Sequence, residues 1–323
     1  MRRVLLATLL ITLTLPLVPA AAQNGAPIGA PVRFAPKDGT LLALDGPGPL
    51  RGSIEVRRQG AALTVVNELD LDHYVMGVRE VPGLWPMEAL KAQAVAARTY
   101  ALWEVQKGYW NRFGFDVCAT VSCQVYQGAA AEEGERGQRW RNAVEATAGQ
   151  VLLDAEGRPA LTRYYSSSGG RTLPNEMPFP DDGPRPYLIG VDDEPDKVSP
   201  LHTWTVRFQR EHLERILRDA IELQGTLVNV RSNQTTRKLV ISTEGGTLEM
   251  PTSRFRSEVS EHAPRIYPSI YPGRRNDGER LPMSLPSSRL DVTKTENGLV
   301  LEGRGYGHGV GDGAGLAGGD QAG

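Results

Sequence analysis

The sequence predicts an α+β fold with a central alanine-rich helix, antiparallel hairpins and a smaller αβ subdomain. Three observations lead to this prediction. Among 323 residues, 36 glycines and 23 prolines indicate many turns. One long helical pattern covers residues 86–107. Several short alternating segments, bounded by turn residues, favour antiparallel strands.

The predicted central helix at residues 86–107 contains six alanines and no glycine. Pro86 is favoured in a first helical turn, and Gly108 is typical of a helix end. Apolar residues recur at spacings of three and four along one face, namely Met87, Leu90, Ala94, Ala97 and Ala101. Most of these side chains are small, which predicts a buried helix that another backbone approaches closely.

Two hairpins flank this helix in the sequence, one joining 54–57 to 63–66 and one joining 150–154 to 160–165. The smaller αβ subdomain is expected at about 200–265. The other predicted elements are a strand and turn at 124–128, a surface-exposed helix at 131–147, strands at 204–208, 227–230, 238–242 and 247–250, and a helix at 212–223.

The N-terminus has the pattern of an export signal peptide. Two arginines precede an apolar run from Val4 to Leu17, and small residues follow up to Ala22. We predict cleavage after Ala22, with a retained N-terminal anchor as the alternative. The predicted organisation is a signal peptide at 1–22, a flexible lead-in at 23–50 and one main domain at 51–323.

Charge excludes some functions. Cleavage would change the formal net charge from −2 to −4, because residues 1–22 contain two arginines and no acid. This balance argues against nucleic-acid binding and gives no reason to expect attraction to anionic lipids. No segment after the signal is long and apolar enough to cross a bilayer. We therefore predict an exported protein of the periplasm or cell envelope without a stable membrane span.

Glu80 is the first candidate for chemistry. It lies in a connection rich in Pro, Gly and apolar residues, between an amphipathic segment at 69–78 and the helix that begins at Pro86. Apolar surroundings disfavour the charged form of a carboxyl. A neutral carboxyl near pH 7 can protonate the leaving oxygen of a glycosidic bond. By pattern alone, an exposed Glu that caps a helix or pairs with Arg79 is the commoner case.

Two polar residues interrupt the alanine-rich helix. Gln93 and Arg98 would need partners if they are buried. Arg98 could then hold a carboxylate or contact a sugar, and Gln93 could contact a substrate. A solvated helix face explains the pattern equally well.

Two glycine-containing loops offer groups that suit sugar recognition. The first holds Tyr165, Ser166, Ser167 and Ser168, whose ring and hydroxyls could stack on and hydrogen-bond to a sugar. The second, at 303–311, projects His308. It lacks the Lys-Ser/Thr pair and the following helix of a phosphate loop, so nucleotide binding is excluded. A plain Ser/Gly turn and a structural His are the alternatives.

Cys118 and Cys123 are the two cysteines of the chain. A pair this close can form a disulfide in an oxidising compartment. It can also supply two ligands to zinc, which usually takes three or four from the protein. No His stands near in the sequence, so any further ligand would have to come from elsewhere in the fold. Both alternatives stay open.

Five segments, in this order, resemble the SpoIID/LytB family over roughly residues 50–311. They are Glu80-Val81-Pro82, Glu88 to Tyr100, Cys123 to Gly128, Tyr165 to Gly170 and Gly305 to Gly311. The stretch from Glu88 to Tyr100 is the most specific. Members usually continue with a Met-Ser-Gln-like segment and a further helix, whereas this chain ends at Gly323, which indicates a truncated or diverged C-terminus.

The resemblance implies a catalytic Glu at Glu80 and a functionally important Arg at Arg98. The residues expected to contact substrate are Gln93, Gln124, Tyr126, Tyr165, Ser166, Ser167, Ser168 and His308. Some members hold zinc through cysteines in the region of Cys118 and Cys123. The upstream His ligand of those members has no counterpart at 109–113, where the chain reads Tyr-Trp-Asn-Arg-Phe.

The family includes lytic transglycosylases that cut glycan strands stripped of stem peptides, and proteins that enhance wall amidases. The resemblance therefore implies a peptidoglycan lytic transglycosylase. Such a lyase cuts MurNAc-GlcNAc bonds and leaves 1,6-anhydroMurNAc ends, with Glu80 acting first as acid and then as base. The alternatives are a non-catalytic wall-binding protein that enhances an amidase, and a zinc hydrolase.

Overall fold

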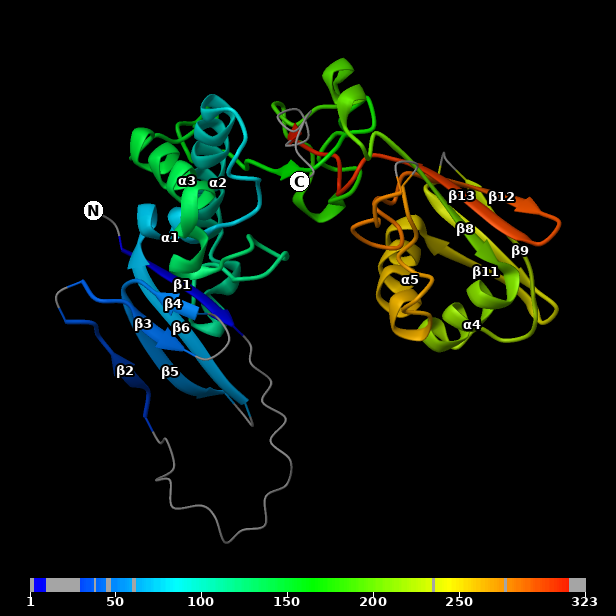
Figure 1. Cartoon of the computed structure of the whole chain (residues 1–323), viewed down its shortest axis with the longest axis horizontal. Coiled ribbons are helices and arrows are strands. Elements are labelled where there is room, and N and C mark those ends of the chain that lie inside the picture. The colour runs from blue at the N-terminus through cyan, green and yellow to red at the C-terminus, as the bar shows by residue number, and fades with distance from the viewer. Residues whose placement is uncertain are drawn as a thin grey trace, which may run out of the picture. The chain divides into compact units, whose positions relative to one another are not determined.

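The computed structural model describes residues 3–9, 30–37, 39–44, 48–59, 62–233, 236–275 and 278–313. The chain divides into two compact units, Met1–Thr162 (unit 1) and Arg163–Gly323 (unit 2). Both units combine helices with antiparallel sheets, as Figure 1 shows. The predicted α+β class is therefore confirmed.

The main sheet of unit 1 has four antiparallel strands in the order β1-β6-β5-β2. Their bounds are Arg3–Leu9 (β1), Val32–Phe34 (β2), Ser53–Gln59 (β5) and Ala62–Asp70 (β6). The pairing of β5 with β6 confirms the first predicted hairpin. Strand β1 falls within the predicted signal peptide, whose remainder lies outside the described residues. A separate hairpin is formed by Leu42–Leu44 (β3) and Gly48–Leu50 (β4).

Three α-helices pack together above this sheet in Figure 1. They are Leu71–Gly77 (α1), Met87–Lys107 (α2) and Gly134–Ala146 (α3), with short 3-10 helices at Tyr109–Phe113 (η2) and Gly128–Glu132 (η3). Helix α2 confirms the predicted central helix, and it ends at Gly108 with a φ of 63°. Its face of Ala94, Ala97 and Ala101 is fully buried, which lets α1 and α3 approach closely.

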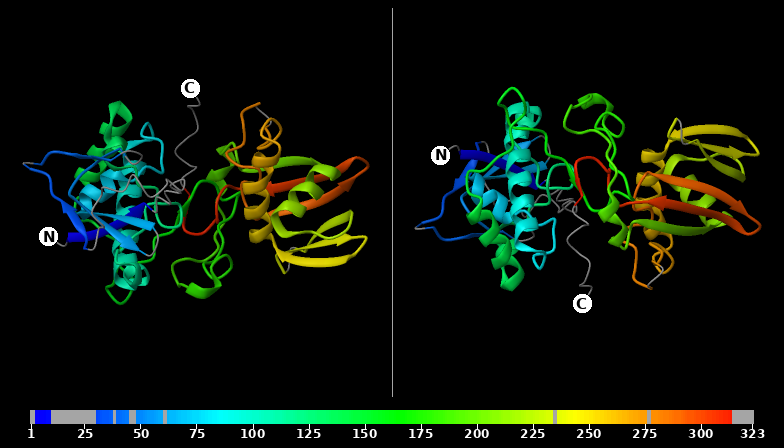
Figure 2. Two further views of the ribbon diagram at one scale, coloured as in Figure 1. Left: turned by 90° about the horizontal axis from the view of Figure 1, so that it is seen from below. Right: turned by 90° about the horizontal axis from the view of Figure 1, so that it is seen from above.

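Unit 2 contains two three-stranded antiparallel sheets, in the orders β11-β10-β9 and β12-β13-β8. Helices α4 and α5 pack on each other, and Figure 2 shows α5 beside the strands. The bounds are Thr203–Gln209 (β8), Arg210–Ile221 (α4), Leu227–Asn233 (β9), Lys238–Thr243 (β10), Gly246–Pro251 (β11), Thr252–Ile266 (α5), Leu290–Thr295 (β12) and Gly298–Arg304 (β13). One hydrophobic core joins both sheets and both helices, including Phe208, Leu213, Leu239, Phe255 and Leu301.

The remaining elements of unit 2 are short. Tyr164–Tyr165 (β7) pairs in parallel with Asp312–Gly313 (β14). Two 3-10 helices, Pro180–Asp182 (η4) and Glu194–Val198 (η5), lie in the connection between β7 and β8. Among the described residues, no helix combines the length and the hydropathy that a bilayer span requires.

Several element predictions need correction. The hairpin at 150–165 is reduced to an isolated bridge between Leu153 and Pro159, because a proline has no N–H to extend the ladder. Helix α3 is not surface-exposed throughout, since Trp140, Ala143 and Val144 are buried. The strand expected at 124–128 forms only one bridge, from Tyr126 to Val78.

The sequence patterns also missed α5, β12 and β13. In α5, Phe255, Val259 and Ala263 recur every four residues and are fully buried. Charged neighbours and Pro264 in the last turn obscured this spacing. Strands β12 and β13 complete the sheet that β8 begins, so the αβ region extends well beyond residue 265.

Candidate functional site

The loop that carries Glu80 is held by backbone pairing to the segment after Cys123. The Gln127 N–H donates to Gly77 O at 2.8 Å, and the Arg79 N–H donates to Val125 O at 2.9 Å. The Val125 N–H then donates to the Glu80 Oε1 at 3.0 Å. The half-buried carboxyl of Glu80 therefore continues the pairing pattern of this two-segment ladder, and its orientation is fixed from one side.

A buried polar pair lies next to this carboxyl. The Tyr74 hydroxyl donates to the Gln124 Oε1 at 2.7 Å, and the Gln124 Nε2 donates to Ala97 O on α2 at 3.3 Å. Burial raises the pKa of the Tyr74 phenol, and the negative charge of Glu80 raises it further. Tyr74 is therefore a neutral donor. Gln124, predicted to contact substrate, is 0% exposed and links α1 to α2.

Tyr126, the next predicted substrate residue, stacks on Tyr74 with ring centroids 5.4 Å apart. Its hydroxyl donates to the Asn67 Oδ1 at 3.0 Å, and burial raises its pKa. The ring lies against Gly77, where an added Cβ would come within 2.3 Å of it. The end of α1, which leads into the Glu80 loop, is therefore shaped by the absence of a side chain at Gly77.

Gln93 and Arg98, the polar residues of α2, are both buried. The Gln93 side chain is 3% exposed, and its Nε2 has no hydrogen-bond partner among the described residues. An unsatisfied buried donor costs roughly 1–3 kcal/mol, which distinguishes this amide from the hydrogen-bonded polar groups around it. Its predicted role in substrate contact stays a prediction.

Arg98 is 1% exposed and binds the protein itself. Its Nε donates to Asp72 Oδ1 at 2.7 Å, on α1, and its Nη2 donates to Val144 O at 3.1 Å, on α3. Its Nη1 donates to Gln150 O at 3.2 Å. The guanidinium therefore ties α2 to α1 and to the end of α3.

The two cysteines form a disulfide, with Cα atoms 5.5 Å apart. Because the two sulfurs are bonded to each other, neither is a thiolate that could bind a metal. Among the described residues no three His, Cys, Asp or Glu side chains are grouped as a metal site would need. The residues around Cys118 and Cys123 thus do not fit zinc. Instead, the disulfide closes the turn that leads into Gln124, and the Tyr126 N–H pairs with Ala119 O across it.

In unit 2, the segment Tyr165 to Gly170, called the serine loop below, is built around a buried acid, Asp196 on η5. Its carboxylate is 1% exposed and accepts bonds from the Ser167 hydroxyl at 2.8 Å, the Ser168 N–H at 2.9 Å and the Gly169 N–H at 2.8 Å. The His202 Nδ1 adds a fourth bond at 2.8 Å. Ser167 and Ser168 therefore hold the loop together, while Ser166 is the half-exposed serine.

The structure brings the serine loop together with the glycine–histidine loop, which is the segment Gly305 to Gly311. The Tyr306 N–H donates to Ser167 O at 2.8 Å, and Tyr306 O accepts from the Ser166 and Ser167 N–H groups. Gly305, with a φ of 73°, lies so close that an added Cβ would come within 2.4 Å of Ser167 O. The alternating glycines thus serve a close approach between two backbones.

His308, within the second of these loops, packs its ring against Tyr165 and Phe179. Its Nδ1 accepts the Val310 N–H at 3.1 Å. Burial, and then the positive charge of Arg163, lower the His308 pKa to about 4. The ring is therefore neutral at pH 7. Tyr165 is also buried, and its hydroxyl has no partner among the described residues.

Sequence patterns did not single out Asp196, His202 or Arg163. Asp196 lies in an acidic run at 192–196 that is typical of an exposed loop, and nothing in the spacing distinguishes it from its neighbours. Arg163 stacks on Phe179 at 3.5 Å and donates to the Asn175 Oδ1 at 2.9 Å. All three act through the fold of unit 2 rather than through a recognisable motif.

Comparison with known proteins places these residues in a family. Residues 59–153 match the family model described as SpoIID, stage II sporulation protein, and relatives named stage II sporulation protein D cover most of the chain. The chain carries a SpoIID domain at residues 59–153. The matched segment contains Glu80, Arg98, both cysteines and Tyr126.

Three relatives illustrate the range of the family. An uncharacterized protein of Brachyspira hyodysenteriae is 31% identical over 265 residues, which cover 80% of this chain and 63% of that protein. The amidase enhancer of Bacillus subtilis is 26% identical over 264 residues, 72% of this chain and 35% of its own length. Stage II sporulation protein D of Bacillus subtilis is 27% identical over 259 residues, 76% of this chain and 67% of its own.

Proposed function

We propose that this chain is an exported peptidoglycan lytic transglycosylase, with Glu80 as the residue that transfers protons. The observation that carries the proposal is the half-buried carboxyl of Glu80, oriented by the Val125 N–H beside the buried Tyr74–Gln124 pair. The match of residues 59–153 to the SpoIID family model supports it. The periplasm or cell envelope is the proposed location.

The proposed first step is protonation. The protonated form of Glu80 gives its proton to the oxygen that joins C1 of MurNAc to GlcNAc, and this C–O bond breaks with its electron pair going to the oxygen. GlcNAc leaves as an alcohol, and an oxocarbenium-like charge develops on the MurNAc ring. The Glu80 carboxylate formed by the transfer faces this positive charge.

In the second step, the Glu80 carboxylate takes the proton from the 6-hydroxyl of the same MurNAc. The 6-oxygen bonds to C1 and closes the 1,6-anhydro ring, which returns Glu80 to its neutral form. No water is consumed. One carboxyl suffices because the nucleophile belongs to the substrate, unlike the paired carboxylates of ordinary glycosidases.

Other residues have supporting roles in this proposal. Arg98 is a positioning residue, because it fixes Asp72 on α1, the helix that leads into the Glu80 loop. Gln93 contributes its unpartnered amide to a substrate acceptor. In unit 2, the half-exposed Ser166 is the serine best placed to contact a glycan.

The test is mass spectrometry of the products from purified glycan strands, with and without stem peptides. We expect a product lighter than the hydrolytic one by one water. Glu80→Gln should lower the rate about 10²- to 10⁴-fold, the usual contribution of a general acid–base residue. Glu135→Gln, on the exposed first turn of α3, is the matched control and should act like the wild type. A hydrolytic product, or full activity of Glu80→Gln, would refute the mechanism.

A second candidate function is supported by the relative named amidase enhancer. In this case the chain binds the wall without cutting it and stimulates a wall amidase. Glu80→Gln would then leave wall binding and amidase stimulation unchanged. A pull-down on purified walls and an amidase assay with the wild-type chain and this variant separate the two functions.

A further inference from the structure

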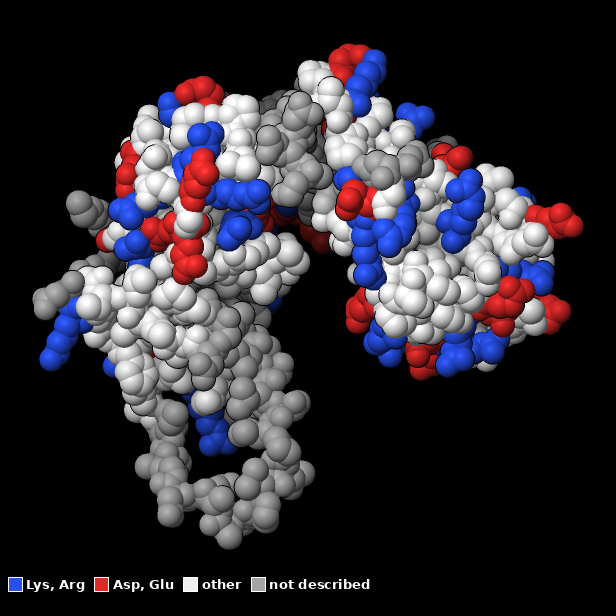
Figure 3. Space-filling model, viewed as in Figure 1, with Lys and Arg blue, Asp and Glu red and all other residues white. Residues whose placement is uncertain are grey.

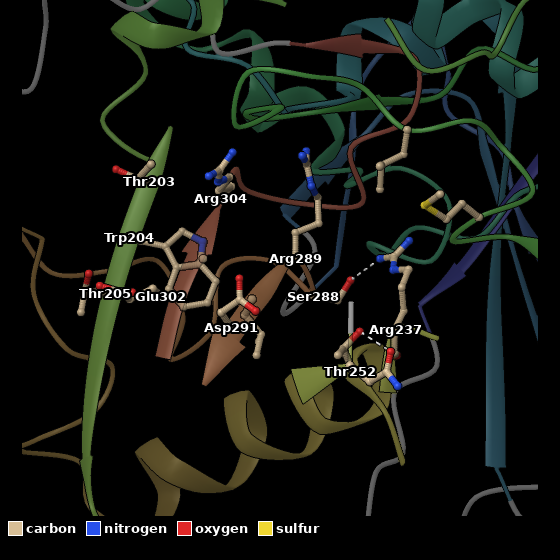
Figure 4. A pocket seen from close by; sticks show the side chains of 15 residues that line it. Thr203, Trp204, Thr205, Arg237, Thr252, Ser288, Arg289, Asp291, Glu302 and Arg304 are labelled. Atoms are coloured by element: carbon tan, nitrogen blue, oxygen red, sulfur yellow. Dashed lines mark hydrogen bonds between the residues drawn. The ribbon is translucent and has the colours of Figure 1, made fainter. Parts of the chain in front are cut away.

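A cavity of about 640 Å³ in unit 2 is lined by none of the residues that carry the proposed reaction. Its walls come from β8, β12, β13 and the start of α5 (Figure 4). This volume lies within the usual range of small-molecule sites. The chemistry of its lining therefore indicates what it can hold.

Three guanidinium groups gather at this cavity, those of Arg237, Arg289 and Arg304. None forms an ion pair with a carboxylate of the described residues. Arg237 donates to the Ser288 hydroxyl at 3.1 Å, but its Nη1 is buried without an acceptor in the described chain. Burial lowers the pKa of Arg289, and the charges of Arg237 and Arg304 lower it further.

Bringing three like charges together costs free energy that a bound anion would recover. The start of α5 adds to the positive potential. Thr252 is the first residue of this 15-residue helix, and its first turn contains no acid. Two carboxylates, Asp291 and Glu302, also line the cavity, so its three guanidiniums leave one net positive charge. That balance suits a ligand with a single negative charge.

The rest of the lining is flat or hydroxylated. The Trp204 indole covers Gly303, where an added Cβ would come within 2.0 Å of the ring. Its Nε1 donates to Gly305 O at 3.0 Å, which fixes the ring as a floor. Hydroxyl and amide groups surround this floor, from Thr203, Thr205, Asn233, Thr252 and Ser288. Such groups match a ligand that carries several hydroxyls of its own.

We infer that unit 2 contains a second binding site, for a polyhydroxylated ligand with one oxyanion. A sugar with a carboxylate and a phosphodiester of a polyol share this chemistry. Arg304 and Arg237 hold the oxyanion, and Trp204 with the hydroxyl groups holds the remainder. This inference does not depend on the proposed reaction at Glu80.

Isothermal titration calorimetry of the whole chain tests it with three probes. N-acetylmuramic acid carries a carboxylate, glycerophosphoglycerol carries a phosphodiester, and N-acetylglucosamine is the neutral match of the first. We expect at least one charged probe to bind about tenfold or more tightly than the neutral sugar, since bonds to charged groups contribute about 1.5–3 kcal/mol. The tighter of the two charged probes identifies the source.

Matched variants locate the site. Arg304→Met, and independently Arg237→Met, should weaken binding of that probe at least about tenfold. Arg215→Met removes the same charge from the exposed face of α4 and should bind like the wild type. Glu80→Gln should also bind normally, which separates this inference from the proposed reaction. Equal binding of the neutral sugar, no binding of any probe, or unchanged binding in both arginine variants would overturn it.

Discussion

Glu80 in unit 1 and Asp196 in unit 2 are both carboxylates that accept backbone N–H groups, but they differ in exposure. Asp196 is almost fully buried and receives four hydrogen bonds from the serine loop and His202. Glu80 is half-buried and is oriented by the Val125 N–H. A buried and saturated carboxylate shapes a loop, whereas a half-buried one can also meet a substrate.

Both units also carry charges of both signs on the face in Figure 3.

The largest expected effect is the loss of stability when the buried carboxylate Asp196 is removed, and it tests the difference between the two carboxylates. Asp196→Ala leaves several buried donors without an acceptor and should destabilise unit 2 by about 3–5 kcal/mol. Glu80→Ala should change stability by less than about 1 kcal/mol, because its side chain is only half-buried. Urea unfolding followed by tryptophan fluorescence compares the two. Similar losses in both variants would contradict the distinction.

The next largest effect is the loss of stability when Arg98 is replaced, and it tests how unit 1 supports Glu80. Arg98→Met removes a buried charge from its bonds to Asp72, Val144 and Gln150, and should destabilise the chain by about 3 kcal/mol. Arg136→Met, exposed on α3, should cost less than about 0.5 kcal/mol.

A positioning role predicts more than lost stability. Well below the unfolding temperature, Arg98→Met should lower kcat more than it changes KM, since α1 no longer presents Glu80 correctly. An unchanged kcat in the folded variant would limit Arg98 to stability alone.

His308 should make unit 2 sensitive to acid. Its folded pKa of about 4 lies below the usual value near 6.5, so the unfolded chain takes up this proton first as the pH falls. Stability is therefore present above about pH 6.5 and falls progressively toward pH 4, by about 3 kcal/mol in total. His308→Gln should lose this part of the pH dependence. Parallel pH curves for wild type and variant would argue against a buried neutral His308.

The smallest effect concerns the disulfide. Reduction, or the pair Cys118→Ser and Cys123→Ser, should cost about 2 kcal/mol through the entropy of the short loop. Activity should fall modestly, because the segment that donates to Glu80 is less constrained. A chelator should leave the folded, oxidised chain unaffected. Inactivation by the chelator without a reductant would favour the zinc alternative.

Local patterns were sufficient for much of the fold. The alanine face of α2 and the β5–β6 hairpin follow from spacing and turn residues that act over a few positions. By contrast, β8 pairs with β13 across about ninety residues, and no local pattern reports such a partner. Charged residues around Phe255 and Val259 likewise concealed α5.

The candidate site divides in the same way. Family motifs led to Glu80, Tyr165 and His308, but they did not distinguish groups that face a ligand from groups that hold the fold. Gln124 and Ser167 were expected to contact substrate, whereas their side-chain partners are Tyr74 and Asp196. Those partners come from distant segments, and a pairing of this kind requires the three-dimensional structure.

The disulfide depends on the redox conditions that the chain has met. Joining the sulfurs of Cys118 and Cys123 releases two electrons and therefore needs an oxidant, which a reducing cytoplasm does not supply. A newly made chain there would keep the turn before Gln124 open, and would close it after passing into an oxidising space. Under the proposed function, the neighbourhood of Glu80 would then be completed only after export, beside the wall that the chain is proposed to cut.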